Sequence, residues 1–288
     1  MNFKLNLLAA AALMAAATPS FAAMQDATSG NGELLVNLRF YTGDNNSGGD
    51  DISAVFDLGV TMNSFLANNG VAGYSQTWSL TSANYGTAWN DVMAFAGAST
   101  AAIEYNVIAL DSTNSNTAGG ARYLTTADVA TFPALSNLNT NNFSFMNSYV
   151  TVNNSRGTHA TEANGASIAG SGDVQNSYFG KVNGGNADGD TWAVQTTADT
   201  TKTLATAQNF WFLTTSSTTS TAQATKTAFG VDLNGNGSIG TGEFGEWSVN
   251  AAAGTITYTA PVPEASTYGM MLAGLGLVGF MARRRLAA

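Results

Sequence analysis

Residues 232–243, with the sequence DLNGNGSIGTGE, place oxygen-bearing side chains at regular intervals. Ca²⁺ takes six to eight hard oxygen ligands at about 2.3–2.6 Å, from carboxylates, amide side chains and main-chain carbonyls. One short loop of this composition can supply most of such a set, so the stretch predicts a structural calcium site. The expected ligands are Asp232, Asn234, Asn236, Ser238 and Glu243.

The same stretch resembles the EF-hand loop, D-x-[DN]-x-[DN]-G-x₅-E, at every specified position. The resemblance implies that Ser238 contributes its main-chain carbonyl, that Glu243 binds through both oxygens, and that Gly237 makes the sharp turn. Two carboxylates alone predict weak affinity, with a dissociation constant of about 10⁻⁴–10⁻³ M. A plain glycine-asparagine turn is the alternative, because the flanking residues look like strands and not like EF-hand helices.

Other residues that carry chemistry are few. The chain has no cysteine and one histidine, His159, which excludes a cysteine peptidase and argues against structural zinc. A serine hydrolase would need a nucleophile and an acid placed around that histidine, and no such constellation is evident. We therefore expect a non-enzymatic protein. The alternatives are a carbohydrate-binding module with exposed tryptophans and a glycoside hydrolase with two carboxylates about 5–9.5 Å apart.

The C-terminal residues 261–288 form a distinct tail. A helix over the uncharged residues 268–282 would reach about 22 Å, against about 30 Å for a bilayer core. We expect a short transmembrane sorting helix whose basic end stays cytoplasmic. An ordinary membrane anchor is the alternative. The parts in order are the stiff start Pro261-Val262-Pro263-Glu264, the apolar run, and the cluster Arg283, Arg284 and Arg285.

The tail also resembles the PEP-CTERM sorting domain, through Val262, Pro263 and Glu264, an Ala-Gly-Leu-Gly-Leu core, and the closing arginines 283–285. Ala265 stands where that family has its second proline. The resemblance implies processing by an exosortase, a membrane cysteine peptidase of Gram-negative bacteria that make exopolysaccharide. It further implies an inner-membrane intermediate and a final place on the cell surface or in the extracellular matrix or biofilm, associated with exopolysaccharide.

The N-terminal residues 1–22 have the pattern of a secretory signal peptide. Lys4 supplies the positive start, and residues 5–17 form the apolar segment. Small residues before the junction predict cleavage between Ala22 and Ala23. Residues 23–260 are then the exported cargo domain.

The cargo is acidic, with six bases and eighteen acids among residues 23–260 and hence a charge near −12. Such a surface repels phosphates, so nucleic acid is not an expected partner. Abundant glycine, asparagine, serine and threonine favour strands joined by turns.

The fold we expect is mainly β, a two-sheet sandwich with one or two short helices. Predicted helices cover residues 82–96 and 134–150, and residues 153–176 are expected to form a loop. Strands are predicted at residues 33–41, 52–58, 60–66, 75–80, 102–110, 177–182, 191–195, 208–214, 246–250 and 255–259.

Overall fold

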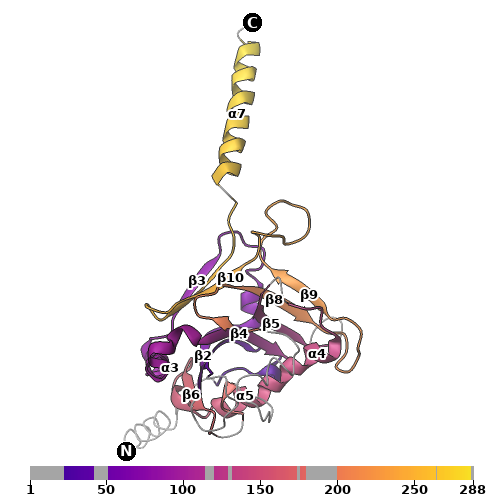
Figure 1. The fold of residues 1–288 in the computed structure, drawn as a ribbon. Helices are drawn as coiled ribbons and strands as arrows, with labels where there is room; N and C mark the ends of the chain where they lie inside the picture. The colour runs from indigo at the N-terminus through magenta and orange to yellow at the C-terminus, as the bar shows by residue number, and fades with distance from the viewer. Residues whose placement is uncertain are drawn as a thin grey trace, which may run out of the picture.

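The computed structural model describes residues 23–41, 51–113, 120–128, 132–173, 176–179, 200–263 and 265–286. Within these ranges the chain is mainly β, as predicted. One curled antiparallel sheet forms the body, short helices pack on it, and a C-terminal helix projects away from it (Figure 1).

Among the described residues the sheet has eleven strands, in the order β3-β11-β10-β8-β5-β4-β1-β2-β6, with β7 added beside β4 and β9 beside β8. Because the described strands form a single hydrogen-bonded path, the predicted two-sheet sandwich is not confirmed. The strands are β1 (Glu33–Phe40), β2 (Ile52–Thr61), β3 (Ser75–Ser79), β4 (Glu104–Asp111), β5 (Arg122–Ala127), β6 (Ala166–Gly170), β7 (Lys202–Thr203), β8 (Gln208–Thr214), β9 (Thr225–Phe229), β10 (Glu246–Asn250) and β11 (Thr255–Thr259).

Both faces of this sheet are buried. A second sheet, as in the predicted sandwich, is therefore not needed to cover either face. On β8, Phe210 faces one hydrophobic core while Trp211 and Leu213 face a second core on the opposite side. Successive side chains of a strand point to opposite faces, so the consecutive apolar residues 210–213 of β8 need cover on both faces. Helices and the curl of the sheet itself provide that cover.

Two sets of helices complete the two cores. Phe65 of α2 and Trp89 of α3 belong to the first core, whereas Met146 and Tyr149 of α5 belong to the second. Predicted helices at residues 82–96 and 134–150 are thus confirmed as helical regions. The helices are α2 (Met62–Leu66), α3 (Ala88–Ala96), α4 (Asn137–Asn141), α5 (Met146–Asn153) and α7 (Ala265–Leu286), with 3₁₀ turns η1 (Ala27–Ser29), η2 (Ala83–Tyr85), η3 (Gly97–Ala102), η4 (Asn142–Phe145) and η5 (Gly157–Ala160).

Some predicted strands are wrong. The strand predicted at residues 60–66 is helix α2 beyond Thr61, because Met62 and Phe65, three residues apart, both reach the first core. The predicted loop 153–176 contains strand β6, which pairs with β2. Ser177 to Phe179 form a turn, while residues 180–182 and the strand predicted at residues 191–195 lie outside the described residues.

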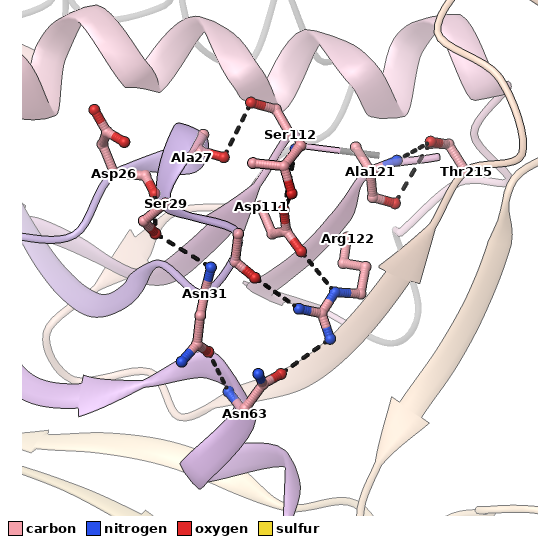
Figure 2. A network of polar contacts seen from close by, with 12 residues as sticks. Asp26, Ala27, Ser29, Asn31, Asn63, Asp111, Ser112, Ala121, Arg122 and Thr215 are labelled. Atoms are coloured by element: carbon pink, nitrogen blue, oxygen red, sulfur yellow. Dashed lines mark hydrogen bonds and ion pairs between the residues drawn. The ribbon is translucent and has the colours of Figure 1, made fainter. Parts of the chain in front are cut away.

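Arg122 of β5 joins three parts of the chain (Figure 2). Its Nε donates to Oδ2 of Asp111 at 2.8 Å, and its two terminal nitrogens donate to Oδ1 of Asn63 at 3.0 Å and to the carbonyl of Gly30 at 2.9 Å. The carboxylate of Asp111 is fully buried, and a buried charge is tolerated when it is paired. This arginine therefore fixes η1 and α2 to the sheet.

Candidate functional site

The predicted calcium loop connects β9 to β10. It lies at the end of the molecule from which α7 departs (Figure 1). A bridge between Gly230 and Phe244 closes the loop, and the N–H of Val231 donates to the carbonyl of Glu243 at 2.8 Å. Strand β9 precedes the loop and strand β10 follows it, so the loop is set between strands and not between helices.

Buried aromatic rings anchor both ends of this loop. Phe229 precedes it and Trp247 follows it, and both are fully buried. Both rings stack on Phe65, at centroid distances of 5.2 Å for Phe229 and 5.6 Å for Trp247. The first core thus holds the two ends of the loop together, as a multidentate cation site requires.

Asp232 turns its carboxylate back over the loop. Oδ2 accepts from the N–H of Gly237 at 2.7 Å, and Oδ1 accepts from those of Gly235 at 2.7 Å and Asn236 at 3.1 Å. The hydrogen bond from Gly237, followed by the others, lowers the pKa of this carboxyl. Gly237 has φ +83°, the left-handed backbone that the predicted sharp turn needs.

Glu243 reaches the loop from its other end. Its Oε1 accepts from the N–H groups of Leu233 at 3.0 Å and Asn234 at 3.1 Å, and its Oε2 accepts from Gly240 at 2.7 Å. The residue is buried, although the middle of the loop is exposed. Both carboxylates therefore face the loop interior from opposite ends.

The side-chain amide oxygens of Asn234 and Asn236 also accept hydrogen bonds from N–H groups of the loop. Oδ1 of Asn234 accepts from the N–H of Asn236 at 3.0 Å, and Oδ1 of Asn236 accepts from the N–H and the hydroxyl of Ser238 at 2.9 and 2.8 Å. All five predicted ligand residues thus lie in one closed loop of hard oxygen donors, a set that suits Ca²⁺. No cluster of three or more histidine, cysteine or carboxylate residues occurs in the described ranges.

A cavity of about 450 Å³ opens beside this loop. Phe244 also lines a second cavity of about 260 Å³, together with Glu246 of β10 and Pro261 at the start of the tail. Sequence reasoning missed both cavities, since their walls come from segments far apart in the chain. The first is lined among others by Trp211, Lys226, Thr227, Asp232, Ser238 and Phe244.

The described tryptophans and the two cavities bear on the alternative functions. Trp89, Trp211 and Trp247 are buried and Trp78 is half-buried, so these four make no exposed platform; Trp192 lies outside the described residues. Asp232 is the one carboxylate residue lining the first cavity and Glu246 the one lining the second.

One pair of carboxylates does lie together, but inside the protein. Asp57 of β2 is fully buried and Glu33 of β1 is 8% exposed. Burial, followed by the neighbouring charge of Glu33, raises the pKa of the Asp57 carboxyl to about 8. Oδ1 of Asp57 accepts from the N–H of Gly59 at 2.8 Å. No signal in the sequence announces this pair, because its members lie on neighbouring strands.

His159, in the 3₁₀ turn η5, is buried, with 4% of its surface exposed. Its Nε2 has no hydrogen-bond partner among the described residues. Burial lowers the pKa of the imidazole to about 4, against a smaller opposing effect of the hydrogen bond with the main chain of Val55. The side chain is therefore neutral at pH 7.

The sorting tail begins where the sheet ends. After β11 the N–H of Ala260 donates to the carbonyl of Tyr74 at 2.8 Å, and Val262 is already 60% exposed. Pro263 is half-buried, and Glu264 lies outside the described residues. Helix α7 then runs for 22 residues and is exposed wherever its side chains are described.

The predicted helix is thus present, but its predicted membrane span is not confirmed. No helix among the described residues combines the length and apolar character needed to cross a membrane. Arg283 is exposed on α7, while the side chains of Arg284 and Arg285 lie outside the described residues.

At the other end, Ala22 and the predicted signal peptide before it lie outside the described residues, and Ala23 is exposed. Met24 is buried, its N–H donates to Oδ1 of Asn154 at 2.8 Å, and its carbonyl accepts from Nδ2 of Asn154 at 3.1 Å. Met24, the second residue after the predicted cleavage junction, is thus part of the folded domain.

Comparison with known families identifies the tail. The model of the PEP-CTERM protein-sorting motif matches residues 261–285. This motif implies an exported protein that reaches the cell surface through the membrane-bound exosortase, its processing partner. No curated protein and no solved structure matches the chain.

Proposed function

We propose that this protein is a non-enzymatic component of the cell surface or extracellular matrix of a Gram-negative bacterium, and that it associates there with exopolysaccharide. The observation that carries the proposal is the PEP-CTERM motif placed directly after the last strand of a folded β domain. The acidic, cysteine-free cargo suits a soluble exported domain.

Export begins, in this proposal, with removal of residues 1–22 after Ala22. The burial of Met24 in the second core supports this boundary, because it places the second residue after the junction inside the folded domain. The tail then holds the cargo at the inner membrane until the exosortase acts. Val262, Pro263, Glu264 and the arginines 283–285 are the residues it would recognise.

The loop Asp232–Glu243 binds a structural calcium ion in this proposal. Asp232 and Glu243 supply the charge, Asn234 and Asn236 supply amide oxygens, and Ser238 supplies its carbonyl. The closed loop of inward-facing oxygens supports this assignment. Bound calcium would tie the exposed middle of the loop to strands β9 and β10.

Cell fractionation tests the proposed function. The protein should appear in the surface and matrix fractions of producing cells and remain with the inner membrane in cells that lack the exosortase. It should also co-purify with exopolysaccharide, and lose its place in the matrix in cells that make none. Equal distribution in the parent and the exosortase-deficient cells would contradict the sorting role, and equal matrix retention without exopolysaccharide would contradict the association.

The tail arginines offer a sharper variant. Replacing Arg283, Arg284 and Arg285 by glutamate reverses the charge that the positive-inside bias requires. We expect the precursor to accumulate, as followed by pulse-chase blotting. A triple lysine variant is the matched control, because it keeps the charge and should be processed like the wild type.

A further inference from the structure

The cavity beside the calcium loop combines aromatic and hydroxyl-bearing walls. Phe244 is half-buried, and its ring centroid lies 5.5 Å from that of the buried Trp211. The indole N–H of Trp211 is already donated to the carbonyl of Ala127 at 3.1 Å, so the residue offers the cavity its ring alone. Thr227 and Ser238 add hydroxyl groups to the lining.

The charged groups of this cavity do not select for an anion, because Lys226 and Asp232, of opposite charge, both line it. The Nζ of Lys226 donates to the carbonyl of Phe132 at 2.8 Å and lies 4.8 Å from the ring centroids of both Phe132 and Trp211. The ammonium is therefore held in place by the protein itself. Across the lining, the Asp232 carboxylate already accepts hydrogen bonds from the loop main chain, and its negative charge opposes the positive charge of Lys226.

These walls match a neutral polyhydroxylated ring that has one apolar face. The volume of about 450 Å³ falls in the range of about 300–1,000 Å³ typical of small-ligand sites. We propose that this cavity binds a neutral saccharide unit, with the apolar face of the sugar on Phe244 and its hydroxyl groups at Thr227 and Ser238. The inference rests on the proposed association with exopolysaccharide and gives that association a site.

Phe244→Ala tests the aromatic wall, and Thr227→Val tests the hydroxyl without changing the shape of an exposed strand residue. Phe95→Ala is the matched control, since Phe95 is 45% exposed on α3 and does not line the cavity. The probe is a set of neutral di- to tetrasaccharides prepared from the exopolysaccharide of the producing cells. Calorimetric titration into the exported protein purified from those cells measures affinity, and circular dichroism confirms the fold of each variant.

We expect Phe244→Ala to weaken binding about tenfold or more, Thr227→Val to weaken it about two- to tenfold, and Phe95→Ala to leave it unchanged. If Phe244→Ala fails to fold, Thr227→Val decides. The site is overturned if the wild type binds none of these probes, or if folded Phe244→Ala and Thr227→Val bind like the wild type. If Phe244→Ala then still co-purifies with the whole polysaccharide, only this site is overturned and the proposed function stands.

Discussion

The main-chain N–H of Gly73 donates a hydrogen bond to the carbonyl of Pro261 at 3.1 Å, which fixes the start of the sorting tail to the turn before β3. A Cβ on Gly73 would lie 3.0 Å from Cγ1 of Val262, and the residue has φ +72°. The same turn contacts the bridge that closes the predicted calcium loop, since the N–H of Gly70 donates to the carbonyl of Gly230 at 3.0 Å. The folded domain therefore holds the chain as far as the first residue of the matched motif.

Gly73→Ala should loosen the start of the tail. A left-handed backbone costs a residue with a Cβ about 1–2 kcal/mol, and here the new methyl group also meets Val262. We expect the amide of Ala260 to exchange with solvent at least about fivefold faster, measured by hydrogen–deuterium exchange.

Gly70→Ala is the control for this variant. Gly70 has φ +82°, and a Cβ added there would meet no atom within 4 Å, so the variant carries the backbone strain without the contact to the tail. Its amide exchange at Ala260 should stay closer to that of the wild type. Equal acceleration in both variants would show that Gly73 does not hold the tail specifically.

Calcium should raise the melting temperature of the protein. A ligand that binds only the folded state stabilises it by about 1.4 kcal/mol at ten times its dissociation constant, which corresponds to a few degrees for a domain of this size. We expect this rise at millimolar calcium, measured by scanning fluorimetry. Glu243→Gln should abolish it while keeping the size of the side chain, whereas Asn236→Ala should only reduce it. A flat response of the wild type would return the loop to a plain turn.

Asp57 should weaken the fold at alkaline pH. Its pKa in the folded protein, about 8, lies above its ordinary value of 3.8, so the folded state keeps the proton. The associated stability is complete below the unfolded value and is lost as the pH rises through 8. Asp57→Asn should therefore be more stable than the wild type at pH 8.5, by about 1–3 kcal/mol in urea titrations. Asp91→Asn on α3 should show no such gain, and an unchanged or lowered stability of Asp57→Asn at that pH would contradict the assignment.

His159 should weaken the fold at acid pH. Its folded pKa of about 4 lies below the ordinary value of 6.5, so the unfolded state binds more protons between these values. Stability is then complete above pH 6.5 and falls as the pH drops toward 4, by up to about 3 kcal/mol. His159→Gln should flatten this slope in the same urea titrations. A slope identical to that of the wild type would place the acid sensitivity elsewhere.

The sequence pattern predicted those strands that bury one face only or that are bounded by turn residues. The strands at residues 246–250 and 255–259 occur as predicted, because alternation and flanking turns define them. The strand at residues 208–214 also occurs as predicted, and its apolar run at residues 210–213 is buried on both faces. The helix at residues 62–66 was missed because a five-residue segment with three apolar residues is too short to distinguish the helix period from the strand period. The sandwich was expected because nothing local reveals that helices cover the second face of the sheet.

The candidate site likewise has a part that the sequence could predict and a part that it could not. The predicted calcium loop is contiguous, so spacing alone suggests its five candidate ligand residues, and that they bind calcium stays a prediction. The cavity beside it depends on Trp211 of β8, Lys226 of β9 and Phe244 beyond the loop, which only the sheet order brings together. Likewise, the pairing of β1 with β2 places Glu33 near Asp57, and no period in the sequence encodes that neighbourhood.

The most direct test of the central claim is the intact mass of the protein recovered from producing cells and from cells that lack the exosortase. The account predicts that the mature protein begins at Ala23 and lacks the segment beyond about Glu264, and that the exosortase-deficient cells retain the tail. A mature protein from the producing cells that still ends at Ala288 would contradict it.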